Sequence, residues 1–132
     1  MNNLPKLYAQ VLGAVLALVG ILGFVPALSL NSNNLLGIFA IDPLHNIIHL
    51  LSGIVGLSAG FLSSGHYARL YAGVFGAVYG LVTIVGFIQG TTVLGLIRVN
   101  AADNFLHTAI AAASLAVFFF FSSTRSPATA HA

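Results

Sequence analysis

The fold is decided by residues 42–57, DPLHNIIHLLSGIVGL, in which four polar side chains stand at the head of a long apolar run. Polar and ionisable side chains are costly in an apolar segment, so where they occur they mark a site or a contact between helices. His45 and His49 are four residues apart, which places both on one face of a helix, and Asn46 borders that face. The stretch therefore predicts a helix with a polar site near its beginning.

The composition predicts an integral membrane protein. Of the 132 residues, 58% are hydrophobic and 5% are charged, and the mean hydropathy is +1.02. Four Lys and Arg residues against two acidic ones cannot form a basic patch, which excludes nucleic acid as a partner and leaves the lipid bilayer as the expected one. The absence of cysteine excludes disulfides, thiolate metal sites and thiol nucleophiles.

Four segments are long enough to cross a hydrocarbon layer, which takes roughly 20 helical residues. They are approximately Leu7 to Val25, Pro43 to Leu62, Leu70 to Ile88 and Ala102 to Phe121. Uninterrupted apolar runs favour helices over the alternating strands of a barrel. We expect an all-α, polytopic membrane protein whose four transmembrane helices form one bundle over residues 1–121, followed by a disordered tail over residues 122–132.

The chain contains a tandem repeat of a two-helix unit. A shift of 63 residues aligns Tyr8 to Val25 with Tyr71 to Ile88, and a shift of 58 aligns Asn46 and His49 with Asn104 and His107. Repeat one covers about residues 6–62 and repeat two about residues 69–121. Because each unit crosses the membrane twice, both copies have the same orientation, and we expect a pseudo-two-fold axis roughly normal to the membrane.

Small residues spaced by four predict close helix packing. The glycine pairs are Gly56/Gly60, Gly76/Gly80 and Gly86/Gly90. In lipid, small residues let helix backbones approach and gain van der Waals contact. These pairs therefore predict a compact bundle.

The distribution of cations predicts the orientation. Lys6, Arg69 and Arg125 fall on the side of the termini and the central loop, and Arg98 falls on the opposite side. Both termini are therefore expected in the cytoplasm, with the protein in a bacterial inner membrane or a thylakoid-like membrane. The polar head of residues 42–57 then lies toward the outer face.

The two outer connectors, residues 31–41 and 91–99, are too apolar to extend into water. We expect them to fold over the outer end of the bundle as short extended pieces paired with one another, since Ile, Val and Phe suit strands. The alternative is a pair of short interfacial helices.

The candidate site is a His/Asn cluster on the second and fourth helices. On the fourth helix Asp103 and His107 are four residues apart, so the second repeat has Asp103 where the first has His45. We expect His49 and His107 to approach each other, with His45 and Asp103 one turn nearer the outer surface. We expect Asp42 to be the N-cap of the second helix, and Asp103 could cap the fourth helix in the same way.

Four roles for the cluster remain open from the sequence. His45, His49, His107 and Asp103 form a ligand set that a transition-metal ion accepts. His49 and His107, supported by Asn46 and Asn104, could instead hold a haem iron, or one of them a chlorophyll-type magnesium. The fourth role needs no cofactor: Asn46 and Asn104 hydrogen-bond the imidazoles, and these polar contacts only hold the helices together.

The cluster suits a non-enzymatic protein, free-standing, in a homo-oligomer or as an accessory subunit of a larger membrane complex. No nucleophile arrangement, paired-carboxylate site or phosphate-binding glycine loop is evident in the sequence. The alternative is a small transporter, a channel or a membrane redox protein that uses the same cluster for protons or a quinone.

The segments HNIIHLLSGIVGL, residues 45–57, and DNFLH, residues 103–107, resemble a family of small bacterial four-helix membrane proteins known only as a domain of unknown function. The resemblance covers nearly the whole chain except the tail, and the Leu-Gly pairs at 36–37 and 94–95 fit it. It implies a four-helix bundle and a role for Asn46, His49, Asn104 and His107. The two halves differ after the second histidine of the motif: an Ala-rich run follows His107, whereas Ser52, Gly53 and Gly56 follow His49.

Overall fold

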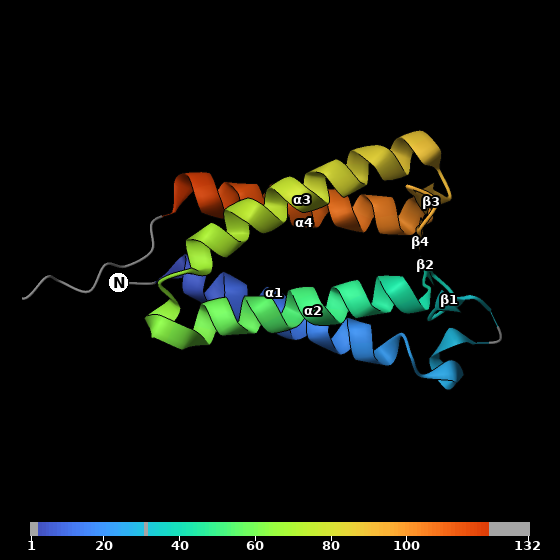
Figure 1. Cartoon of the computed structure of the whole chain (residues 1–132), viewed down its shortest axis with the longest axis horizontal. Coiled ribbons are helices and arrows are strands. Elements are labelled where there is room, and N and C mark those ends of the chain that lie inside the picture. The colour runs from blue at the N-terminus through green and yellow to red at the C-terminus, as the bar shows by residue number, and fades with distance from the viewer. Residues whose placement is uncertain (1–2, 31, 122–132) are drawn as a thin grey trace, which may run out of the picture.

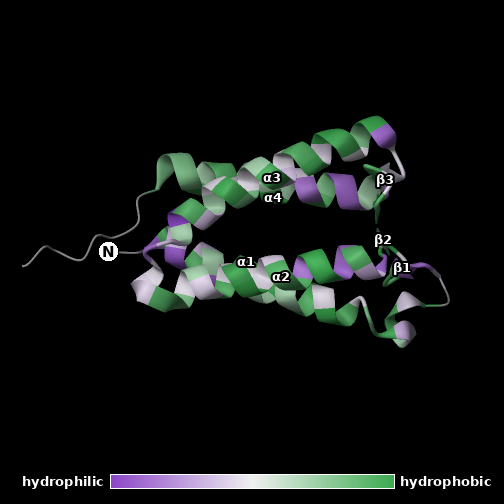
Figure 2. Ribbon diagram, in the orientation of Figure 1, coloured by the Kyte–Doolittle hydropathy of each residue, from purple (hydrophilic) through white to green (hydrophobic). Residues whose placement is uncertain are grey.

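The structure is a computed structural model that describes residues 3–30 and 32–121. Its long helices are α1 (Leu4–Leu22), α2 (Pro43–Phe61), α3 (Ala68–Gln89) and α4 (Ala101–Phe120). All four are long and apolar enough to cross a membrane, and they pack as a bundle, which confirms the predicted fold class. Figure 2 shows apolar residues along most of their length, with hydrophilic residues on α2 and α4 toward one end. The predicted tail, residues 122–132, lies outside the described residues.

α1 begins at Leu4 instead of Leu7 because Asn3 caps it. The Asn3 side chain accepts a hydrogen bond from the Lys6 backbone N–H at 3.1 Å, which satisfies one of the free donors of the first turn. The helix ends at Leu22, and the 3-10 helix η1 (Pro26–Ser29) follows. At the other end of the bundle, the short 3-10 segment η2 (Leu62–Gly65) joins α2 to α3 (Figure 1).

Each outer connector folds into its own small β-hairpin. β1 (Asn34–Leu35) pairs antiparallel with β2 (Phe39–Ala40), and β3 (Thr92–Val93) pairs antiparallel with β4 (Ile97–Arg98). The extended conformation is confirmed, but the expected pairing of one connector with the other is wrong. The alternative, a pair of short interfacial helices, is not found in residues 32–41 and 91–99 either, although η1 precedes β1.

The turn of each hairpin explains why its strands pair locally. The central residues of both turns have positive φ: Leu36 at 53° and Gly37 at 71°, Leu94 at 55° and Gly95 at 68°. Two successive positive values of φ are typical of tight hairpin turns whose twist matches that of the flanking strands, and the register leaves residues 36–38 and 94–96 between the paired positions. The duplicated Leu-Gly pairs are therefore the turns of two equivalent hairpins.

α1 packs on α2 and α3 packs on α4, so that each repeat is a helical pair (Figure 1). In the first pair the backbones touch at glycines. A Cβ added at Gly13 would lie 2.5 Å from the Leu57 backbone nitrogen, and one at Gly53 would lie 2.3 Å from the Ala17 backbone nitrogen. In the second pair, side chains fill the equivalent contact, because the nearest atom to a Cβ at Gly76 belongs to the Leu115 side chain.

The predicted relation between the repeats is visible in contacts that join them. Tyr8 on α1 hydrogen-bonds the Ser114 hydroxyl on α4. Its repeat partner, Tyr71 on α3, reaches α2, where its hydroxyl would lie 2.6 Å from a Cβ added at Gly56, the residue equivalent to Ser114. The Tyr71 hydroxyl donates a 3.1 Å hydrogen bond to the Ser52 carbonyl there. The two tyrosines therefore make equivalent crossings, as a two-fold relation requires.

Candidate functional site

The outer ends of α2 and α4 are held by carboxylates that also bind the opposite hairpin. In the first repeat Asp42 is the N-cap of α2, and its Oδ1 accepts the His45 backbone N–H at 2.8 Å. Its Oδ2 accepts the Arg98 backbone N–H of β4 at 2.6 Å. The expected capping role of Asp42 is confirmed, and the same side chain connects the two repeats.

The second repeat divides these two tasks between two residues. Asn100 caps α4 by accepting the Asp103 backbone N–H at 3.0 Å. Asp103 Oδ2 accepts the Asn100 backbone N–H at 2.9 Å and the Ala40 backbone N–H of β2 at 3.0 Å. Asp103 therefore completes a capping box with Asn100 and also fastens the first hairpin to α4. In both roles its carboxylate accepts hydrogen bonds from backbone N–H groups.

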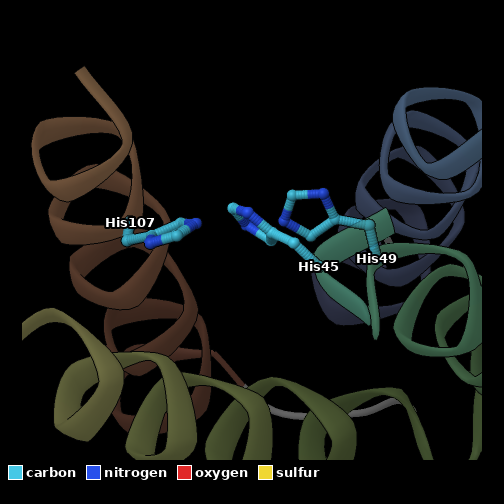
Figure 3. A group of neighbouring side chains, drawn as sticks. All are labelled: His45, His49 and His107. Carbon is cyan, nitrogen blue, oxygen red and sulfur yellow. The ribbon is translucent and has the colours of Figure 1, made fainter. Parts of the chain in front are cut away.

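Three imidazoles meet below these caps and form what we call the histidine cluster, consisting of His45, His49 and His107. Figure 3 shows His107 extending from α4 toward His45 and His49 on α2. The ring centroids of His45 and His49 are 4.4 Å apart, and that of His107 lies 5.8 Å from the first and 6.1 Å from the second. The expected approach of His49 and His107 is present, and His45 joins them instead of forming a separate outer tier.

The cluster is buried and its nitrogens are close enough to share one ligand. The exposed fractions of His45, His49 and His107 are 3%, 8% and 3%. One ligand nitrogen from each ring lies within 4.8 Å of the other two. The nitrogens around a tetrahedral zinc ion are about 3.4 Å apart, given zinc to nitrogen distances of about 2.0–2.1 Å. The separation of up to 4.8 Å between the histidine nitrogens is wider than this, so the rings would have to move closer to hold one ion.

Asp103 does not join this group, although the sequence placed it among the metal ligands. The metal-compatible group found among the described residues contains the three histidines and no carboxylate. Both hydrogen bonds to Asp103 Oδ2 come from backbone N–H groups, so this side chain is directed at the hairpin and the helix start.

The asparagines do not support the imidazoles in the expected way. Asn46 and Asn104 are buried, and in residues 3–30 and 32–121 no hydrogen bond joins either of them to a histidine. Each lies instead against a glycine of the neighbouring helix: a Cβ at Gly23 would be 2.0 Å from Asn46 Oδ1, and one at Gly86 would be 2.2 Å from Asn104 Oδ1. The equivalent asparagines and glycines thus form equivalent contacts in the two repeats.

The histidines keep nitrogen atoms free. The Nδ1 atoms of His45, His49 and His107 are all buried and have no hydrogen-bond partner in the part of the chain that the structure describes. Buried polar groups nearly always have a partner. The rings can therefore act as ligands or as hydrogen-bonding groups toward a molecule that enters the cluster.

Comparison with known proteins identifies a family. A family model described as a domain of unknown function, DUF4383, matches residues 6–120. The chain belongs to the DUF4383 family. No curated protein and no solved structure matches the chain. The DUF4383 match covers both repeats, and therefore both helices that carry the histidine cluster.

A row of aromatic rings in this DUF4383 chain leads to the cluster, and the sequence analysis missed it. Tyr71, Phe75 and Tyr79 stack along α3 with ring centroids 5.2 Å and 4.0 Å apart. The Tyr79 ring then meets the His107 ring edge to face at 5.3 Å. The spacing of four residues could have indicated the row, because residues four apart lie on one helix face.

Proposed function

We propose that this chain is a non-enzymatic membrane protein that binds one transition-metal ion in the histidine cluster. One observation carries the proposal: three buried imidazoles converge from two repeats, and each has an unpartnered nitrogen. Buried polar atoms nearly always have a partner, so converging imidazoles that each keep an unpartnered nitrogen are available to bind a ligand.

The ligand chemistry favours a first-row metal of intermediate softness. Imidazole suits zinc, copper, iron and nickel, whereas magnesium and calcium prefer oxygen ligands. Three histidines without a carboxylate or thiolate also leave a fourth coordination position open for water or another small ligand.

The geometry gives less support to a macrocycle. A haem held by His49 and His107 needs a plane between the two rings that is free of side chains. The His45 ring lies 4.4 Å from the first and 5.8 Å from the second. A bare ion uses all three rings, whereas a haem would have to displace one of them.

The purely structural alternative, in which polar side chains only join helices, loses its main contact. That role relied on hydrogen bonds from Asn46 and Asn104 to the imidazoles, and the amide oxygens lie against glycines instead. The transport alternative uses the same histidines, and Asp42 and Asp103 add nothing to it because both accept backbone hydrogen bonds at helix starts.

The test is a metal-binding measurement on protein purified in detergent without a polyhistidine tag. After removal of bound metal with a chelator, titration with Zn²⁺ should show one site per chain. Replacing His107 by alanine should weaken binding by at least about 100-fold, since even changes in the outer coordination shell weaken metal sites by about 10–100-fold.

His66 provides the matched control, because it is an exposed histidine at the opposite end of the bundle. His66→Ala should bind zinc as the parent does. If His107→Ala binds as tightly as His66→Ala, the proposed site is wrong. If the parent takes up no zinc, copper, iron or nickel while His107→Ala is less stable, the cluster is structural.

The orientation enters this proposal as a prediction. Lys6 and Arg69 lie at the end of the bundle opposite the hairpins, and Arg98 lies on a hairpin. By the positive-inside rule the histidine cluster then faces the periplasmic or extracellular side. Cysteine labelling from outside, at a cysteine introduced at Leu94 and at one introduced at Ser64, tests this, and only the first should react with an impermeant reagent.

A further inference from the structure

A lateral groove runs between α2 and α3 and ends at the histidine cluster. Its volume is about 620 Å³, within the range of about 300–1,000 Å³ that small-molecule sites occupy. α2 and α3 belong to different repeats and make few contacts with each other, which leaves this space. Its lining extends along α3 from Tyr67 to Val82, a length of about 22 Å at 1.5 Å per helical residue.

The groove has a buried aromatic floor and exposed apolar walls. The floor is the row of Tyr71, Phe75 and Tyr79, whose side chains are all buried. The walls include Val55 of α2 and Val78 of α3, which are 58% and 50% exposed. In a membrane these exposed walls face lipid, so the groove is open to a molecule dissolved in the bilayer.

The outer end of the groove is polar. All three members of the histidine cluster line it, and so does Tyr79, whose side chain is buried. Imidazole and phenol groups donate hydrogen bonds to carbonyl oxygens and accept them from hydroxyls. The groove therefore offers hydrogen bonds at one end and apolar contact over the remainder.

The occupant should be uncharged. No Lys, Arg, Asp or Glu occurs among the described residues that line the groove. The guanidinium of Arg98 is bound to the Asn33 carbonyl at 2.7 Å and to the Asn34 side chain at 3.3 Å, so it is not directed into the groove. A charged headgroup would be desolvated there without a partner of opposite charge, which is costly.

We propose that this groove binds a single-chain lipid with a flat, uncharged head that carries carbonyl or hydroxyl oxygens, the chemistry of an isoprenoid quinone. The head lies against the histidine cluster and Tyr79, and the tail lies on the aromatic floor toward the opposite end of the bundle. This inference does not depend on the proposed metal, because metal-free imidazoles and the Tyr79 hydroxyl supply the hydrogen bonds.

The experiment uses the intrinsic fluorescence of the chain. The protein has no tryptophan and four tyrosines, and three of these, Tyr67, Tyr71 and Tyr79, line the groove. Metal-stripped protein in lipid nanodiscs is titrated with a decyl-chain benzoquinone. A bound quinone should quench most of the tyrosine emission in a saturable manner.

Two pairs of variants locate the binding. Val78→Phe narrows the groove and should weaken binding at least tenfold, whereas Val11→Phe, at a residue of α1 that is 55% exposed and outside the groove lining, should not. His107→Gln should weaken binding at least fivefold and His66→Gln should leave it unchanged. Circular dichroism must show equal helix content in all four variants.

Three outcomes would overturn the proposal. Quenching that rises linearly with quinone and is equal in all variants means that the quinone only partitions into the bilayer. Displacement of the quinone by a single-chain phospholipid at equal concentration means that the groove accepts any lipid tail. Binding that Val78→Phe does not affect places the quinone elsewhere. Because metal is absent throughout, failure of zinc binding leaves this result unaffected.

Discussion

Replacing Gly53 by alanine is expected to lower the free energy of unfolding by about 2 kcal/mol. A Cβ at this position would lie 2.3 Å from the Ala17 nitrogen and 2.7 Å from the Gly13 carbonyl oxygen. Because both atoms belong to the α1 backbone, α1 must move as a whole, and we take the upper end of the usual overpacking cost, about 3 kcal/mol. Alanine recovers about 1 kcal/mol through its higher helix propensity.

Gly80 provides the control, because a Cβ there has nothing within 4 Å. Gly80→Ala gains the helix propensity without an overlap, so it should stabilise the protein by up to about 1 kcal/mol. Reversible unfolding in mixed micelles of increasing dodecyl sulfate content, followed by circular dichroism, measures both variants. If the two have the same stability within about 0.5 kcal/mol, the backbone contact between α1 and α2 is not as close as the structure shows and the reasoning fails.

The same assay tests three further changes. Asp103→Ala removes the acceptor of two backbone N–H groups and should cost about 2–4 kcal/mol, whereas Thr108→Ala, which loses only a bond within its own helix, should stay within about 0.5 kcal/mol. Tyr8→Phe leaves the fully buried Ser114 hydroxyl without its partner and should cost about 1–2 kcal/mol; an unchanged stability would contradict the crossing of the repeats. Gly37→Ala forces a side chain into a positive φ of 71° and should cost about 1 kcal/mol without altering zinc binding.

Features of the structure that depend on neighbouring residues, or on the internal repeat, could be predicted from the sequence. The cap at Asp42 follows from the Asp-Pro pair at a helix start. The approach of His49 and His107 followed from the repeat alone, since equivalent residues in two related units lie at the same depth. Repetition therefore predicted a contact between helices that no single segment contains.

Contacts that depend on how two helices cross could not be predicted in this way. Asn46 lies against Gly23, the residue that follows α1, and this contact depends on the rotation of α1 about its own axis. The glycine pairs spaced by four also did not identify which glycines make close helix contacts. Gly56 lies against Tyr71, whereas Gly80 and Gly90 face open space. A spacing of four identifies a shared helix face but does not identify what that face contacts.

The hairpins show a different limit. The composition of the connectors indicated extended structure, but the partner of each strand is set by the turn. Leucine at positive φ is uncommon, and neither Leu36 nor Leu94 resembles the Asn or Asp that usually stands at this turn position. The glycine after each leucine was the available signal.

The difference between the two repeats explains why the cluster has three histidines. In the second repeat the capping task falls to Asn100 and the hairpin contact to Asp103, so the carboxylate occupies the third helical position. In the first repeat Asp42 performs both tasks, one with each carboxylate oxygen. The equivalent third position carries His45, whose side chain interacts with the backbone of Ala40 and Arg98 and adds a third imidazole to the pair formed by His49 and His107.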